Sequence, residues 1–140
     1  MVAIIIGTHG KLSQELLRAS EMIYGKQNNI TTIDFEPEEG IHSLKIKYEE
    51  ALRRLDISKG VLILVDLFGG SPYNVAINMA MNREEIQVIT GVNLPMILGV
   101  YSLREKGELR ELVKVAQSSG KLGIIPFKRN SEFSGKEDFE

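Results

Sequence analysis

The stretches VAIIIGTHG at Val2–Gly10 and VLILVDLFGGSP at Val61–Pro72 are the most informative about the fold of this chain. Each begins with five consecutive apolar residues and then turns abruptly into glycine and polar residues. Apolar runs without alternation are typical of strands buried on both faces, as in parallel sheets that helices cover on both sides. We therefore predict two central strands, at Val2–Ile6 and Val61–Val65.

Around these two runs, two further β-branched stretches predict strands at Ile30–Phe35 and Gln87–Thr90. Amphipathic segments with helical spacing lie between and after the strands. The apolar positions predicted to face the core are Leu12, Leu16, Ala19 and Ile23 in the first helix, and Ile41, Leu44, Tyr48, Leu52 and Leu55 in the second.

Two later helices are marked by proline. The third helix is predicted to open with Ser71 as its N-cap and Pro72 at its first position. A fourth helical region is predicted to begin at Pro95, to break at Gly107 and to resume at Leu109.

Strands that alternate with helices form βαβ units, and right-handed crossovers leave few topologies. Placing the two most apolar strands side by side in the centre predicts an open, mostly parallel α/β sheet of order 2-1-3-4, with helices on both faces. A last apolar run, Leu122–Phe127, contains Pro126, which fits an edge strand and argues against a central one. Ligands of such sheets bind at the switch point, here between the first and third strands.

The composition predicts an ordinary globular protein. The chain has 140 residues, of which 43% are hydrophobic and 26% charged, and its net charge is −2. Without cysteine and with only two histidines, we expect no disulfide, no metal site that needs sulfur and no multi-histidine metal site. We expect no other metal and no cofactor either, and the lack of a basic excess argues against a nucleic-acid partner. The apolar opening is too short for a signal peptide or membrane span, which predicts a cytoplasmic protein.

We assign residues 1–128 to one domain and the polar residues 129–140 to a frayed tail.

The switch point brings two chemically useful residues together. His9 follows the first strand and Asp66 follows the third, so we expect them to face each other across the crevice. A carboxylate that accepts a hydrogen bond from one imidazole nitrogen leaves the other nitrogen free as a nucleophile or base. Taken singly, each could be a turn residue, but together they indicate a catalytic site. The second histidine, His42, is interpreted as a solvated surface residue.

A glycine-rich turn, Gly69-Gly70-Ser71, leads from the same switch point directly into a helix. Free backbone N–H groups and the helix dipole favour an anion such as phosphate at such a position. The sequence holds neither G-x-x-x-x-G-K-[ST] nor G-x-G-x-x-G, which excludes a P-loop and a dinucleotide fingerprint. A tight strand-to-helix connection is the alternative reading of the turn.

Three motifs in this order, IIIGTHG at Ile4–Gly10, VDLFGGSP at Val65–Pro72 and GVNLPM at Gly91–Met96, resemble the enzyme IIA component of the mannose-type (mannose/fructose/sorbose) bacterial sugar phosphotransferase system. The resemblance runs from residue 2 to about residue 128. It implies a phosphocarrier in which His9 takes a phosphoryl group from the carrier protein HPr. The group would pass to a IIB component on a separate chain and reach the IIC and IID membrane components through it.

The same resemblance implies further properties of the site and the assembly. The implied site residues are His9 and Asp66 as the catalytic pair, Gly69, Gly70 and Ser71 as ligands of the phosphoryl oxygens, and Thr8, Gly10 and Asn93 in supporting parts. Leu67 stands where some relatives have a threonine. A homodimer that exchanges the final edge strand is also implied. Two alternatives stay open: a phosphoryl donor subunit for a dihydroxyacetone kinase, and a regulatory module that is phosphorylated on His9.

Overall fold

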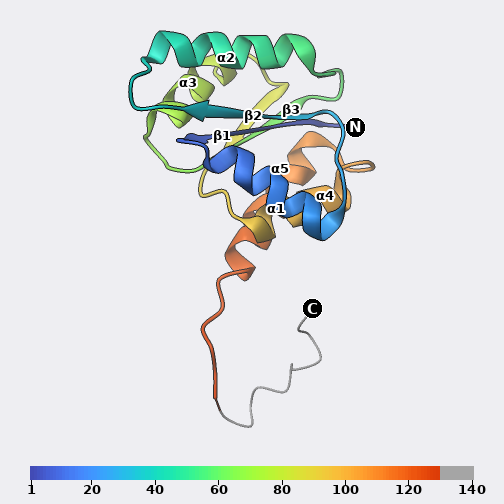
Figure 1. Cartoon of the computed structure of the whole chain (residues 1–140). Coiled ribbons are helices and arrows are strands. Elements are labelled where there is room, and N and C mark those ends of the chain that lie inside the picture. Colours follow the sequence, from blue (N-terminus) through green and yellow to red (C-terminus); the bar gives the residue numbers. More distant parts are fainter. Residues whose placement is uncertain (130–140) are drawn as a thin grey trace.

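Strands and helices alternate along the chain in the computed structural model, which describes residues 1–129 (Figure 1). The elements follow one another in the order β1 (Ala3–His9), α1 (Leu12–Tyr24), β2 (Ile30–Phe35), α2 (Ile41–Arg54), β3 (Val61–Val65), α3 (Ser71–Ala80), β4 (Ile86–Ile89), α4 (Leu94–Leu103) and α5 (Leu109–Leu122). The predicted α/β class is confirmed.

The sheet has β1 in its middle, paired in parallel with β2 on one side and with β3 on the other, while β4 pairs with β3. The predicted order 2-1-3-4 is therefore confirmed. β1 continues beyond its predicted end at Ile6, because Gly7 still pairs with Val65 and His9 with Phe35. His9 is thus the last residue of a strand, where we expected a loop residue after the strand.

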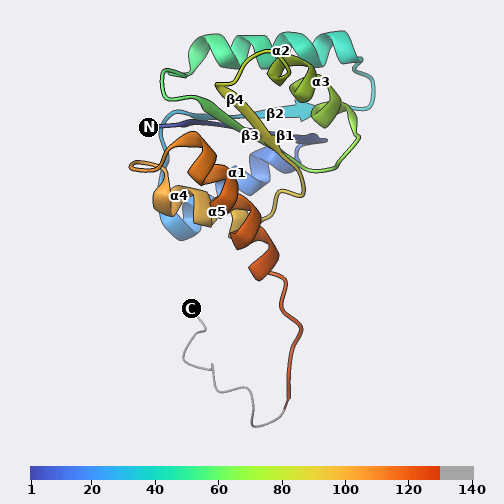
Figure 2. The ribbon, with the colours of Figure 1, turned by 180° about the vertical axis from the view of Figure 1, so that it is seen from behind.

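Helices cover both faces of the sheet (Figures 1 and 2). α2 and α3 lie on one face, whereas α1, α4 and α5 lie on the other. Successive residues of β1 alternate between the two cores, so that Ile5 packs with α2 and α3 and Ile4 with the opposite layer. Every residue of β3 is buried, which explains its continuous apolar run. β4, at the open edge, lies one residue earlier than predicted.

The buried face of α1 differs from the predicted one. Leu12 and Ile23, predicted to face the core, are about half exposed, whereas Ser13 and Ser20 are fully buried. Both serines have their hydroxyls satisfied: Ser13 donates to the Ile33 carbonyl and Ser20 shares a hydrogen bond with a tyrosine of α4. Small hydrogen-bonded side chains can therefore face the sheet in place of larger apolar ones. Ile41 of α2 is likewise exposed rather than buried.

Both proline-marked helices begin one residue earlier than predicted. α3 begins at Ser71, with Gly70 as its N-cap and Pro72 in its second position, so the prediction of a Ser71 cap is wrong. α4 begins at Leu94, and its cap is Asn93. Proline fits the first turn because its missing N–H would have no helical partner there, and this does not select one position within the turn.

The final apolar run does not form the expected strand within the single chain. Leu122 is the last residue of α5, and residues 123–129 have no strand pairing. The segment leaves the body of the molecule (Figure 1). Its large apolar side chains are 76, 78 and 72% exposed, and they are Ile124, Ile125 and Phe127. A strand needs a neighbouring strand for its backbone hydrogen bonds, and this segment has none within residues 1–129.

The predicted polar tail at 129–140 lies, apart from Arg129, outside the described residues. Within residues 1–129, no helix combines the length and the apolar character that crossing a membrane requires.

Candidate active site

The carboxyl ends of β1 and β3 bring His9 and Asp66 together, as the topology predicted. Asp66 Oδ2 accepts one hydrogen bond from the His9 backbone N–H and lies 3.0 Å from both that nitrogen and the ring Nδ1. The His9 side chain is 47% exposed and the Asp66 side chain 16%. Two contacts to one oxygen hold both the strand end and the orientation of the imidazole ring.

This contact determines which ring nitrogen is free. An ionised carboxylate has no proton to donate, so the hydrogen bond to Asp66 places the proton of neutral His9 on Nδ1. Nε2 then carries the free lone pair, through which an imidazole can react as a nucleophile or base. The second carboxylate oxygen of Asp66, Oδ1, is buried and has no hydrogen-bond partner within residues 1–129. A positive charge on the His9 ring would therefore be neutralised by a carboxylate that is already in contact with it.

The glycine turn lies against the Nε2 edge of the ring. A Cβ atom on Gly70 would lie 2.8 Å from His9 Cε1 and 3.4 Å from Nε2, so a side chain there would press on the nucleophilic edge. Gly69 has a φ of 83°, in the left-handed region that glycine adopts without strain. The two glycines therefore serve different needs, one for the turn and one for the close approach to His9.

The N-terminus of α3 follows this turn and offers unpaired donors. The backbone N–H groups of Ser71 and Tyr73 have no acceptor within residues 1–129, and Pro72 between them has no N–H. Donors of this kind at a helix N-terminus suit an anion. No group of three or more histidine, cysteine, aspartate or glutamate side chains in the described chain is arranged to hold a metal ion. The arrangement suits a phosphoryl group held by backbone donors beside a nucleophilic imidazole.

Of the three residues expected in supporting parts, two lie next to His9. Thr8 is buried, and its Oγ1 accepts a hydrogen bond from the Ser13 backbone at the start of α1. Gly10 adopts a φ of 57° and donates its N–H to the Phe35 carbonyl. Asn93 has a different role, because its Oδ1 accepts from a backbone N–H of α4 and its Nδ2 donates to a carbonyl of α5. Its hydrogen bonds in the described chain do not reach the His9 site.

Three aromatic residues of the site were not predicted as site residues. Phe35 stands edge-on to the His9 ring, with centroids 6.1 Å apart and planes at 76°. Phe68 is exposed on the turn after β3 and packs on the Tyr73 ring at 4.9 Å. Tyr48 was assigned to the core only, although its hydroxyl donates to the Pro72 carbonyl at 2.9 Å. A hydroxyl within an apolar stripe was the one signal of Tyr48 in the sequence.

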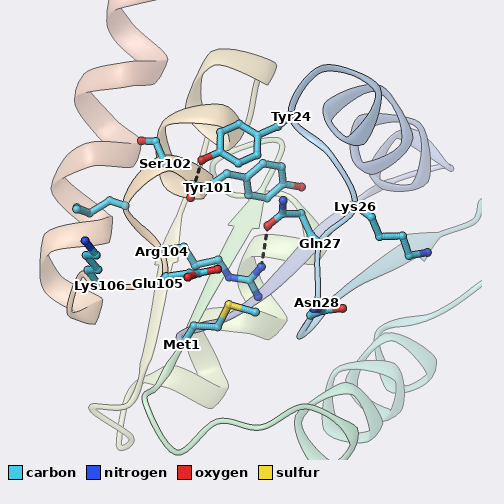
Figure 3. A pocket seen from close by; sticks show the side chains of 11 residues that line it. Met1, Tyr24, Lys26, Gln27, Asn28, Tyr101, Ser102, Arg104, Glu105 and Lys106 are labelled. Carbon is cyan, nitrogen blue, oxygen red and sulfur yellow. Dashed lines mark hydrogen bonds between the residues drawn. The ribbon is translucent and has the colours of Figure 1, made fainter.

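At the opposite end of the sheet, where the strands begin (the amino edge), a cavity of about 430 Å³ lies beside Arg104 (Figure 3). Arg104 is 1% exposed, and each guanidinium nitrogen donates a hydrogen bond: Nε to the Val2 carbonyl, Nη1 to the Gln27 side chain and Nη2 to the Asn29 carbonyl. Burial lowers the pKa of Arg104 below its usual value. These bonds tie the end of α4 to the starts of β1 and β2, so Arg104 is a structural clamp.

This chain is similar in sequence and in fold to known proteins. The family model described as "PTS system fructose IIA component" matches residues 3–117. The mannose-specific EIIAB component of the phosphotransferase system of Escherichia coli K12 is 42% identical over 128 residues, which cover 91% of this chain and 40% of that protein. The fructose-specific EIIA component of Bacillus subtilis is 41% identical over 113 residues, covering 81% of this chain and 77% of that protein.

A solved structure of an EIIA component from Streptococcus agalactiae superposes with a TM-score of 0.82 at 27% identity, covering 90% of this chain and 97% of that one. The chain spans less than half the length of the mannose-specific relatives that it matches, and most of the length of the fructose-specific one. Because the family model covers most of the chain and the relatives exceed 40% identity, we conclude that this chain belongs to the EIIA-man family of phosphotransferase system IIA components.

Proposed function

We propose that this chain is a phosphocarrier of a sugar phosphotransferase system, in which His9 accepts a phosphoryl group from phosphorylated HPr and passes it to a IIB component. The observation that carries the proposal is the contact between Asp66 and the Nδ1 side of His9, which leaves Nε2 free beside the N-terminus of α3. Membership of the EIIA-man family supports it. The activity would be that of a phosphotransferase with a phosphohistidine intermediate.

In the proposed step, the lone pair of His9 Nε2 attacks the phosphorus of the donor phosphohistidine. The Nε2–P bond forms while the N–P bond of the donor breaks, and the bonding electrons return to the donor ring. His9 keeps its Nδ1 proton, so its ring becomes cationic, and Asp66 neutralises that charge. The nucleophile needs no general base, because its lone pair is already free. Transfer to IIB runs through the same bonds in the opposite sense.

The turn and the first turn of α3 would hold the phosphoryl oxygens. The backbone N–H groups of Ser71 and Tyr73 are unpaired in the described chain, and Gly70 leaves room for the group next to Nε2. A dianionic group is favoured at this end of the helix by the helix dipole. We propose that Gly69, Gly70 and Ser71 surround the phosphoryl group as the resemblance implies, with the Ser71 N–H as a donor, whereas the Gly70 N–H already donates to the Leu67 carbonyl.

We also propose a homodimer in which residues 123–129 add to the sheet of a second copy. The apolar side chains of this segment, Ile124, Ile125 and Phe127, are largely exposed in the single chain. β4 has a free edge, since it pairs with β3 alone in the described sheet. An unpaired edge strand and an exposed apolar segment satisfy each other when two copies meet. Light scattering at micromolar concentration tests the proposal, and a monomer would contradict it.

The test of function is incubation with phosphoenolpyruvate, enzyme I and HPr, followed by intact mass and by transfer to an acceptor. We expect the mass to rise by one phosphoryl group, with the acid-labile and base-stable behaviour of phosphohistidine. Loss of the group to a mannose-type IIB protein would support sugar uptake. Transfer to a dihydroxyacetone kinase subunit would favour the first alternative, and retention of the group on this chain in the presence of every acceptor would favour the regulatory module.

A further inference from the structure

Tyr48 connects α2 to the turn that lines the His9 site. Its side chain is 0% exposed, and its hydroxyl donates to the Pro72 carbonyl at 2.9 Å. Pro72 is buried in the first turn of α3, directly after Ser71. A hydrogen bond at this position acts on the helix end that follows the glycine turn, and this turn lies against the imidazole.

The same hydroxyl lies against the strand that carries His9. Gly7 precedes His9 by two residues on β1, so both positions face the same side of the sheet. A Cβ atom on Gly7 would collide with the Tyr48 hydroxyl, which therefore occupies the space that a side chain would take. Tyr48 is wedged between the His9 strand and the first turn of α3, and it contacts both.

The electrostatic surroundings keep this hydroxyl a donor. Burial raises the pKa of Tyr48, and the negative charge of Asp66 raises it further. The hydroxyl therefore stays protonated and continues to donate to the Pro72 carbonyl at any pH at which the protein works. A buried hydroxyl without a partner would be costly, and the Pro72 carbonyl supplies that partner. Phenylalanine would fill the same core volume, so what the hydroxyl adds to packing is this hydrogen bond.

We propose that Tyr48 is a positioning residue for phosphoryl transfer, whose hydroxyl sets the separation between the His9 strand and the N-terminus of α3. At this separation, His9 Nε2 and the free N–H groups of α3 can contact the same phosphoryl group. The inference rests on the proposed function. It assigns Tyr48 no contact with the reacting atoms.

The test compares Tyr48→Phe with a matched control, Tyr101→Phe. Tyr101 is 4% exposed, lies on the opposite face of the sheet and shares a hydrogen bond of 2.9 Å with the Ser20 hydroxyl. Both variants lose one buried hydroxyl, so both are expected to melt at a lower temperature. If Tyr48 had a structural role alone, the lower melting temperature would be the only change in Tyr48→Phe.

At a temperature where both variants are folded, phosphorylation by phosphorylated HPr is measured in single turnovers. We expect the saturating rate of Tyr48→Phe to fall about tenfold, because small misplacement of reacting groups is costly. The HPr concentration at half saturation should not change, since Tyr48 is buried. The ³¹P shift of phosphorylated His9 should move in Tyr48→Phe and stay unchanged in Tyr101→Phe. A wild-type rate and shift in Tyr48→Phe, or an equal loss in Tyr101→Phe, would overturn the proposal.

Gly7→Ala approaches the same contact from the strand. The added methyl group must displace the Tyr48 hydroxyl, so we expect a similar loss of rate, and Gly40→Ala, where nothing lies within 4 Å, serves as its control. In the double variant the losses should not add, because both changes break one contact. Additive losses would contradict the proposal. Wild-type protein in the same assay separates the two questions, since its failure to accept a phosphoryl group would overturn the proposed function itself.

Discussion

Charged side chains lie at both ends of the strands, at the carboxyl edge and at the amino edge of the sheet, and they differ in how fully they are hydrogen-bonded. At the carboxyl edge, Asp66 holds His9 through Oδ2 while Oδ1 has no partner in the described chain, and the His9 ring is partly exposed. At the amino edge, Arg104 is almost completely buried, and all three of its guanidinium nitrogens donate hydrogen bonds. The first arrangement leaves hydrogen-bonding capacity unused, at the buried Asp66 Oδ1 and on the partly exposed imidazole, whereas the second uses it within the protein.

This contrast separates a reactive group from a structural one. A buried charge is tolerated when its polar atoms are satisfied, and its role then ends with the elements that it connects. A histidine held by a carboxylate can still react when one of its ring nitrogens has a free lone pair and its side chain is partly exposed. The cavity of about 430 Å³ therefore lies beside a structural clamp, whereas the proposed phosphoryl transfer takes place at the opposite end of the sheet.

The largest expected effect is that of His9→Ala. This variant should take up no phosphoryl group from phosphorylated HPr, because no other imidazole in the described chain is held with a free nitrogen beside the N-terminus of α3. Its melting temperature should stay close to that of the wild type, since the side chain is 47% exposed. Intact mass after the phosphorylation reaction gives the result. His42→Ala, which removes the exposed histidine of α2, is the control and should behave as wild type.

Asp66→Asn tests the role of the carboxylate at the same edge. The amide keeps the shape but removes the charge that orients Nδ1–H and neutralises the ring, so we expect phosphorylation to slow by roughly 10²–10³-fold. Stability should change little, because Oδ1 has no partner to lose. Rapid-quench kinetics measure the rate. Asp34→Asn, at the end of the neighbouring strand, is the matched control, and an unchanged rate in Asp66→Asn would reduce that carboxylate to a turn residue.

Arg104→Met should give the reverse pattern at the amino edge. The carbonyls of Val2 and Asn29 lose their donor, and we expect the free energy of unfolding to fall by about 3 kcal/mol. Urea denaturation measures this loss. The phosphorylation rate of the folded variant should equal that of wild type, and a rate loss comparable to that of Asp66→Asn would break the distinction between the two edges. Arg18→Met, at an exposed ion pair with Glu15, should change stability by less than about 1 kcal/mol.

The smallest effect is expected at Glu39, a partly exposed group whose hydrogen bonds are satisfied. Bonds from Lys47, the Glu36 backbone and Ser43 lower the pKa of Glu39 from 4.5 to about 2. A lowered folded-state pKa means that this contribution to stability is present above pH 4.5 and disappears as the pH falls toward about 2. Melting temperatures across this window should fall less steeply in Glu39→Gln than in wild type. Glu38→Gln, which removes an exposed neighbouring carboxylate, should follow the wild-type curve.

Sequence patterns predicted the elements whose environment is uniform along their length. β1 and β3 are buried on both faces, so the residues of their predicted runs are apolar without exception and their central place can be read directly. The proximity of His9 and Asp66 follows from that placement, because adjacent parallel strands end at one edge. These predictions needed no knowledge of any side-chain contact.

Predictions about single positions succeeded less often where a distant partner decides the outcome. The exposed face of α1 and the burial of Ser13 depend on a carbonyl in β2. The capping role of Asn93 depends on α4 and α5, and no spacing in the sequence distinguishes it from a ligand of the site.

The class of the fold, the strand order and the meeting of His9 with Asp66 follow from the amino-acid sequence alone. Hydrophobic periodicity is visible in neighbouring positions, and the right-handed crossover rule applies to each connection between parallel strands. Three other features required the folded structure, namely which imidazole nitrogen is free, how Tyr48 touches both the His9 strand and α3, and why Arg104 is buried. These depend on hydrogen bonds between residues far apart in the chain. The direction of such a bond is set by the packing of whole elements, and no local pattern carries it.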